Sequence, residues 1–161
     1  MRKTVFFFFL LYSCSPTPCQ KTYNSLIKEI EINDLTKNLI TIKSQKEFSD
    51  FLLLNSDFLI PFFELKTPLE EEDVSQVYSL IDNIYYDSLY LDVEETFRDF
   101  SFVYNELNHS FHLYNKQSKI KFQPKLNIIV SGFYNDLQVS SNSLTVGIEY
   151  FLKKGNKYKP S

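Results

Sequence analysis

The sequence predicts an α+β protein in which several helices, one of them long and amphipathic, pack on a small antiparallel sheet. The chain has 161 residues, which is enough for one domain with a hydrophobic core. Only 3 residues are glycine, so few turns with a positive φ are available and helices joined by Asn, Asp, Ser and Pro loops are favoured. Apolar residues at helical spacing fill the middle of the chain, and alternating apolar and polar residues lie near its ends.

The N-terminal region has the features of a bacterial lipoprotein signal. Arg2 and Lys3 precede the apolar run TVFFFFLLYS, which is too short to cross a bilayer as a helix. The run ends in LYSC, which resembles a lipobox: leucine at −3, a small residue at −1, then Cys14. In that class the cysteine thiol takes a diacylglycerol, and the signal is cut just before it. We therefore predict a signal peptide over residues 1–13 and lipidation at Cys14.

The segment after Cys14 is expected to be a tether between lipid and domain. A lipidated Cys14 cannot form a disulfide with Cys19, and two cysteines fall short of the four ligands of a structural zinc site. Prolines in SPTPCQKT favour an extended chain, so we predict a flexible tether over residues 14–25 and a single α+β domain over residues 26–161. The alternative is ordinary signal cleavage nearby, which would leave both thiols free or paired.

The domain is expected to begin with a strand over residues 26–34, where Ile30 and Ile32 alternate with Glu29 and Glu31. Alternation of this kind is typical of a strand.

A helix is expected to follow from Ser44, because Ser44 and Glu47 have capping-box spacing. The apolar residues expected on its buried side are Phe48, Phe51, Leu52 and Leu54. A second short apolar segment, SDFLIPFFEL, is interrupted by Pro61.

The next helix is predicted to begin at Thr67, with Thr67 as N-cap, Pro68 at the first helical position and Glu70 at the third. The acidic run from Glu70 to Asp73 could suggest cation binding. It is better interpreted as a helix start, because carboxylates complement the positive end of the helix dipole.

The longest element is predicted over residues 88–117, before Pro124. Its apolar seam recurs at alternating steps of four and three residues and consists of Val93, Phe97, Phe100, Tyr104, Leu107, Phe111 and Tyr114. Coiled-coil dimerisation could use such a seam, but three aromatic-rich heptads more often pack on a sheet of the same chain.

Two strands are predicted after this helix, over residues 125–133 and 142–152, paired as a hairpin or wide antiparallel pair. One face of the second strand would hold Leu144, Val146, Ile148, Tyr150 and Leu152. We expect Val146 and Ile148 to pack on Phe97, Phe100 or Tyr104. Gly147 would face the other way and leave room for a further backbone, so a Gly147→Val change would be tolerated.

The residues indicate no catalytic or metal chemistry. His109 and His112 stand three residues apart, and Glu106 with His109 has the Glu-x-x-His spacing of di-iron bundles, but no second copy of that motif exists. Phosphate-loop, nucleophile-elbow and His-Glu-x-x-His motifs are absent from the sequence. We therefore predict no enzyme activity, no catalytic residue, no cofactor and no metal site. The net charge of −3 argues against nucleic-acid binding.

The last third of the chain contains a strand motif with a Lys-Tyr-x-Pro-like tail, formed by Leu144, Val146, Gly147, Ile148, Glu149, Tyr150, Phe151, Leu152, Lys157, Tyr158 and Pro160. These residues match the pattern Leu-x-(Ile/Val)-Gly-(Leu/Ile)-(Asp/Glu)-(Tyr/Phe)-(Tyr/Phe)-Leu, and on this motif the chain resembles the gliding-motility lipoprotein family GldB of Bacteroidota. The early EIEI strand and the long helix follow the same order. Lys153 replaces the family's glycine. The resemblance implies the N-terminal half of such a protein, similar to the front part of a zinc-peptidase-like fold whose His-Glu-x-x-His helix would lie beyond Ser161.

The resemblance implies a membrane-anchored, non-enzymatic lipoprotein of the gliding machinery and its linked secretion system. It would face the periplasm from the cell envelope, with the outer membrane favoured over the inner, and act through contacts with other machinery proteins. One alternative is a degenerate metallopeptidase-like lipoprotein without its catalytic half. Another is a lipid-tethered periplasmic binding module, which clustered Tyr and Phe side chains on an exposed concave face would favour.

Overall fold

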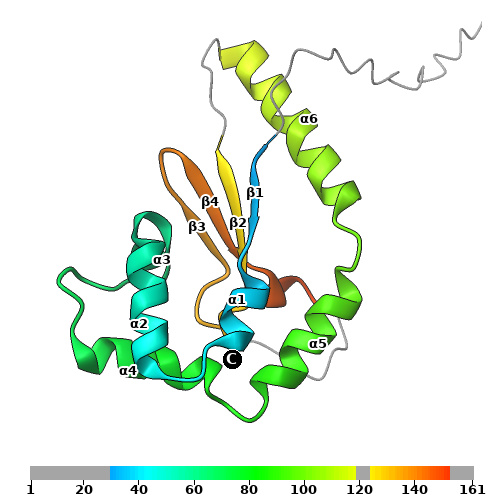
Figure 1. The fold of residues 1–161 in the computed structure, drawn as a ribbon. Helices are drawn as coiled ribbons and strands as arrows, with labels where there is room; N and C mark the ends of the chain where they lie inside the picture. Colours follow the sequence, from blue (N-terminus) through cyan, green and yellow to red (C-terminus); the bar gives the residue numbers. More distant parts are fainter. Residues whose placement is uncertain (1–29, 119–123, 153–161) are drawn as a thin grey trace, which may run out of the picture.

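The computed structural model of the protein describes residues 30–118 and 124–152. Within these residues it contains six α-helices, a four-stranded sheet and one 3-10 helix (Figure 1). In chain order the elements are β1 (Ile32–Asp34), α1 (Thr36–Thr41), α2 (Gln45–Leu54), α3 (Ser56–Phe62), α4 (Glu71–Ile81), α5 (Tyr86–Thr96), α6 (Ser101–Ser118), β2 (Lys125–Ile129), β3 (Leu137–Val139), β4 (Ser143–Gly147) and η1 (Ile148–Phe151). The predicted α+β class is confirmed.

The sheet is mixed, and the prediction of an antiparallel sheet is wrong. Its strand order is β1-β2-β4-β3; β1, β2 and β4 run parallel, and only β3 is antiparallel to its neighbour. The chain between β2 and β4 forms β3, and β3 pairs with β4 as an antiparallel hairpin. Because of this insertion, β4 lies beside β2 and runs in the same direction. Most residues of β2 and β4 are at least partly buried, as is usual for parallel strands covered on both faces.

Helices lie on two sides of this sheet. Figure 1 shows α2 and α3 toward β3 and β4, and α5 and α6 beyond β1; α3 contacts both β3 and β4. A core of phenylalanines forms where α2 and α3 meet the sheet: Phe48, Phe62 and Phe63 are fully buried, and their rings meet edge to face. The ring centroids of Phe62 and Phe63 are 5.1 Å apart, a geometry that aromatic pairs favour.

The start of α2 agrees with the predicted capping pattern. The Ser44 hydroxyl accepts a hydrogen bond from the Glu47 backbone N–H at 3.2 Å, while Glu47 Oε2 accepts from the Lys43 N–H at 2.8 Å. Phe48 is buried as predicted, but Leu54 is 84% exposed. Leu54 lies six positions after Phe48, which places it on the other side of a helix with 3.6 residues per turn.

The helix predicted from Thr67 begins later, at Glu71, with Glu70 as N-cap and no side-chain cap. The preceding chain stays irregular while Leu65 and Leu69 pack against the core. The acidic residues nevertheless occupy the first turn of α4, as the dipole interpretation predicts.

The predicted long helix is divided into α5 and α6. Asp99 lies in the break, and its Oδ1 accepts a hydrogen bond from the Ser101 backbone N–H at 2.9 Å. This bond lowers the pKa of Asp99 and favours a new helix start over continuation. The seam residues from Val93 to Phe111 still pack on the core, whereas Tyr114 is 50% exposed.

The last predicted strand ends early, at Gly147, where the chain turns into η1. A Cβ at Gly147 would lie 2.1 Å from the backbone oxygen of Asn135. The close backbone therefore belongs to this same chain, and the expectation that Gly147→Val would be tolerated is wrong. The prediction that one strand face holds Leu144 to Leu152 is also wrong, because the strand ends at Gly147 and the following residues form η1.

β1 is an edge strand and begins at Ile32, later than predicted. Ile30, just before the strand, is buried, whereas Ile32 is 37% exposed. The lipobox with Cys14, the second cysteine Cys19 and the predicted tether lie outside the described residues. Within the described residues, no helix combines the length and apolar character that crossing a bilayer requires.

Candidate functional site

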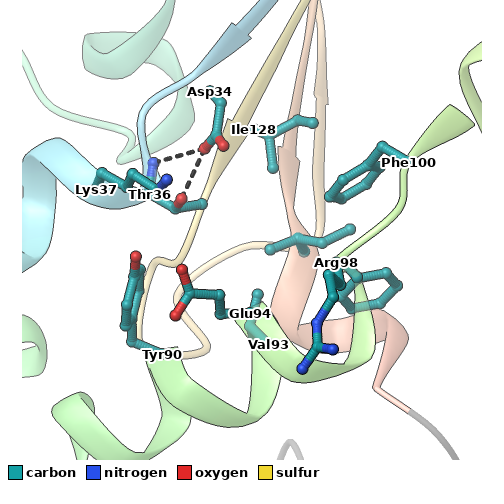
Figure 2. A pocket seen from close by; sticks show the side chains of 11 residues that line it. Asp34, Thr36, Lys37, Tyr90, Val93, Glu94, Arg98, Phe100 and Ile128 are labelled. Atoms are coloured by element: carbon teal, nitrogen blue, oxygen red, sulfur yellow. Dashed lines mark hydrogen bonds between the residues drawn. The ribbon is translucent and has the colours of Figure 1, made fainter.

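A cleft of about 330 Å³ opens at the carboxyl end of the parallel strands (Figure 2). Its lining residues are Asp34, Thr36, Lys37, Tyr90, Val93, Glu94, Phe97, Arg98, Phe100, Ile128 and Ile148. They come from the ends of β1 and β2, from α1 and α5, from the α5–α6 break and from η1. Open sheets with parallel strands commonly bind ligands at this edge.

The turn from β1 into α1 positions Asp34 on the rim. Asp34 Oδ1 accepts hydrogen bonds from the Thr36 backbone N–H at 3.0 Å and from the Thr36 hydroxyl at 2.6 Å. Such an Asx turn is typical of aspartate just before a helix. Because Oδ1 holds the turn, the Asp34 carboxylate is fixed in place while the residue itself stays exposed.

The floor of the cleft is apolar. Val93, Ile128 and Ile148 are buried, and the half-buried rings of Phe97 and Phe100 stack with centroids 5.5 Å apart and planes 20° apart. The break between α5 and α6 turns both rings toward the cleft. Ile148 lines the same cleft as Phe97 and Phe100, whereas Val146 is not among the lining residues.

Tyr90 and Glu94 lie one turn apart on α5, and their side chains lie next to each other in the cleft (Figure 2). Burial raises the pKa of the Tyr90 hydroxyl, with further contributions from the charges of Glu94 and Asp34 and from the side-chain hydrogen bond to Glu94. The hydroxyl thus stays protonated at neutral pH and remains a hydrogen-bond donor beside two carboxylates.

The two cations of the lining, Lys37 and Arg98, are both exposed. The Arg98 guanidinium points away from Asp34 and Glu94 in Figure 2. Within the described part of the chain, neither cation makes an ion pair with either carboxylate. The cleft therefore combines an apolar floor with carboxylates that no internal salt bridge neutralises.

A buried carboxylate, that of Glu149, organises the loop that follows β2. Glu149 is 1% exposed, and its Oε1 accepts hydrogen bonds from the Ser131 N–H at 2.7 Å, from the Ser131 hydroxyl and from the Phe133 N–H at 2.9 Å. Gly132 and Phe133 have φ values of 72° and 65°, so the backbone curls around the carboxylate. This N–H cradle gives a turn with two left-handed residues a fixed shape.

The second oxygen of Glu149, Oε2, is buried and accepts no hydrogen bond from the described residues. Burial raises the pKa of Glu149, and the hydrogen bonds from Ser131 and Phe133 oppose that rise. The neighbouring Tyr86 hydroxyl donates instead to the Val130 carbonyl at 2.8 Å. Sequence reasoning placed Glu149 in a strand and missed this role; the signal was a lone acidic residue inside the apolar stretch VGIEYFL.

Two buried asparagines were also missed by sequence reasoning. Asn108 on α6 accepts a hydrogen bond from the Ile30 backbone N–H at 2.9 Å, which ties the helix to the chain just before β1. Asn127 on β2 joins Asn33 and Thr145 of the neighbouring strands through side-chain bonds of 3.2 Å each. Both asparagines support the sheet that carries the cleft, and neither lines it.

The histidines weighed for metal binding, His109 and His112, lie half-buried on α6 with Glu106, away from the cleft lining. Among the described residues, no three His, Cys, Asp or Glu side chains are grouped in a way that could hold a metal ion.

The family model described as gliding motility protein GldB matches residues 18–161. This chain belongs to the GldB family. The resemblance read from the C-terminal motif is thus confirmed over nearly the whole chain. No curated protein and no solved structure matches the chain significantly, and the likeness to a zinc-peptidase fold is not confirmed. Membership of this lipoprotein family of the gliding machinery indicates a cell-envelope location for this GldB family member.

Proposed function

We propose that this GldB family member is a lipid-anchored, non-enzymatic component of the gliding machinery that acts through contacts with other proteins of that machinery. The family match over residues 18–161 carries the assignment to gliding. The cleft at the carboxyl edge of the sheet supports the contact role, because it offers buried apolar surface next to unneutralised charge. Interfaces that depend on a few anchoring side chains use such pockets.

The proposed anchor is the diacylglycerol on Cys14, supported by the LYSC sequence and the basic residues before the apolar run. The domain then faces the periplasm, from the outer membrane in preference to the inner. Two or three acyl chains hold a protein more stably than a single myristoyl chain does.

The non-enzymatic part of the proposal is supported by how the polar residues of the cleft are used. The Asp34 carboxylate holds a turn, and Tyr90 is a protonated hydroxyl bonded to Glu94. No serine, cysteine or histidine is among the residues that line the cleft. The arrangement is suited to holding a partner rather than to nucleophilic chemistry.

A complementation experiment tests this function. Cells that lack the gene are complemented with the wild type, with the double variant His109→Ala/His112→Ala, or with a cleft variant, Ile148→Glu, and colony spreading is scored together with protein level. The two histidines are the only ones in the chain, so a non-enzymatic component should restore spreading without them. Ile148→Glu places a charge in the cleft floor and should impair spreading.

Two outcomes would contradict the proposal. One is loss of spreading in the histidine double variant at a normal protein level, which would point to acid–base or metal chemistry. The other is normal spreading in cells that lack the gene.

A periplasmic binding module for an envelope ligand is a second candidate. The observation that favours it is the presence of three aromatic side chains, those of Tyr90, Phe97 and Phe100, in one cleft. A strain with normal gliding but altered retention of an envelope component would favour this candidate.

A further inference from the structure

We propose that the cleft receives a lysine or arginine side chain of a partner protein, with Asp34 and Glu94 binding the charged end and the apolar floor binding the aliphatic stem. This inference rests on the protein-contact role proposed above and names the chemistry of that contact.

The first support is the division of the lining into an apolar floor and an acidic rim. Long cationic side chains combine a hydrocarbon stem with a charged head, and they favour sites that bury the stem and leave the head at a polar rim. Here Ile128, Ile148 and Val93 are buried, while Asp34 and Glu94 are exposed beside them. A purely apolar side chain would leave the negative charge of both carboxylates without a cation beside it.

The second support is the stacked pair of Phe97 and Phe100 in the apolar lining of the cleft. A lysine ammonium or arginine guanidinium over an aromatic face gains a cation–π interaction, which strengthens as water is excluded. Figure 2 shows the ring of Phe100 on the side of the cleft opposite Tyr90 and Glu94. An entering cation would therefore lie between an aromatic face and a carboxylate.

The third support is that the Asp34 carboxylate is held in a fixed orientation and, among the described residues, makes no ion pair with a cation of the cleft. Asp34 Oδ1 accepts both hydrogen bonds from Thr36, so this carboxylate is already oriented before a partner arrives. In the described part of the chain it makes no ion pair with Lys37, and Arg98 points away from it. Preorganised groups lose less entropy on binding.

Lys37 allows this arrangement to be tested, because its positive charge lies in the same cleft lining as the two carboxylates. Its charge opposes an incoming cation at short range. Removing that charge should strengthen binding of a cationic side chain and weaken binding of an anionic one.

The experiment titrates the full chain, purified in nonionic detergent and labelled with ¹³C at its isoleucine methyl groups, with three blocked tripeptides. The peptides are acetyl-Gly-Lys-Gly-amide, the same peptide acetylated on the lysine amine, and acetyl-Gly-Glu-Gly-amide. We expect the lysine peptide to shift the Ile128 and Ile148 methyl signals saturably. The other two peptides should bind with an affinity at least about fivefold lower, which is the factor that one partly exposed ion pair supplies.

Three variants complete the test. Asp34→Asn with Glu94→Gln keeps the side-chain shapes and should weaken the lysine peptide by at least about fivefold. Lys37→Gln should strengthen it. Lys46→Gln, on α2 and outside the cleft lining, is the matched control and should leave the affinity unchanged.

The proposal is overturned if no peptide shifts these methyl signals, if the acetylated and free lysine peptides bind equally, or if the glutamate peptide binds best. Equal binding would indicate a groove for apolar side chains, and preference for glutamate would indicate an anion site at Lys37 and Arg98. These titrations do not measure motility, so their failure is separate from failure of the complementation experiment.

Discussion

At the residue scale, Glu149 determines the shape of the loop that follows β2. One carboxylate oxygen accepts hydrogen bonds from two backbone N–H groups and one hydroxyl, and these donors lie in a turn with two left-handed residues. A buried donor that loses its acceptor costs much more than the bond contributes on average. The loop therefore depends on this single side chain.

We expect Glu149→Ala to destabilise the domain, because the buried Ser131 N–H loses its acceptor, at about 1–3 kcal/mol, and the partly buried Phe133 N–H loses its acceptor as well. Glu149→Gln keeps Oε1 as acceptor and should be distinctly less harmful. Urea denaturation of both variants measures the difference. Equal free energies of unfolding for the two variants would mean that the N–H cradle contributes little.

The pH dependence of stability provides a second measurement on Glu149. Burial raises its pKa above the usual 4.5, so the folded protein keeps this proton to a higher pH than the unfolded chain does. Unfolding then releases a proton above pH 4.5, and the free energy of unfolding falls as pH rises from there toward the folded-state pKa. Compared with Glu149→Gln, the wild type should lose stability over this range. A wild type that gains stability relative to the variant would contradict the raised pKa.

Gly147 is the second decisive residue, since any side chain there meets a backbone oxygen of this chain. A Cβ would lie 2.1 Å from the Asn135 carbonyl oxygen, well inside contact distance. Gly147→Ala should therefore cost about 1–3 kcal/mol or more through overpacking. Ile148→Ala, which empties part of a buried site, should cost about 2–5 kcal/mol. A Gly147→Ala variant as stable as the wild type in urea would show that the loop at Asn135 can move aside.

At the element scale, α6 depends on polar and partly buried contacts rather than on a fully buried apolar face. Among the described residues of α6 only Asn108 is fully buried, and its Oδ1 accepts from the Ile30 N–H. Tyr104, Leu107 and Phe111 pack on the core but remain partly exposed. The Asn108 bond thus ties the helix to the chain just before β1, in addition to these packing contacts.

Asn108→Ala should cost about 1–3 kcal/mol, because the buried Ile30 N–H loses its acceptor. Ser110→Ala, at an exposed position of the same helix, is the matched control and should change little. Urea denaturation measures the cost, and hydrogen exchange of the Ile30 amide should accelerate in Asn108→Ala alone. Unchanged exchange at Ile30 would show that another contact holds α6 in place.

At the scale of the whole molecule, the proposed anchor decides where the cleft can work. Two or three acyl chains at Cys14 would keep the domain at a membrane surface, where its partners in the machinery are also concentrated. The length of the proposed tether, residues 14–25, would limit how far from the membrane the domain can contact a partner.

Cys14→Ala should release the protein from the membrane fraction, whereas Cys19→Ala, the matched control, should not. Metabolic labelling with a radioactive fatty acid should mark the wild type and Cys19→Ala but not Cys14→Ala. An unlabelled wild type would contradict lipidation at Cys14, and so would membrane retention of Cys14→Ala.

Local sequence patterns determined several features of this protein by themselves. Ser44 and Glu47 start α2 through hydrogen bonds between near neighbours, and the acidic turn of α4 complements its own helix dipole. The C-terminal motif led to the GldB family, which the family match confirms. These features depend on residues close together in the chain, so periodicity and composition can reveal them.

Tertiary structure alone decided the sheet topology, the division of the long helix and the site. Parallel pairing of β2 with β4 follows from the insertion of β3, and strand alternation looks the same in either direction. Asp99 breaks a seam whose spacing is continuous in sequence. The cleft joins Asp34 to Glu94 and Ile148, residues that are far apart in the chain, and the cradle of Glu149 needs a turn 16 to 18 residues away. No local pattern encodes contacts of that range, because they form only when separate elements pack against one another.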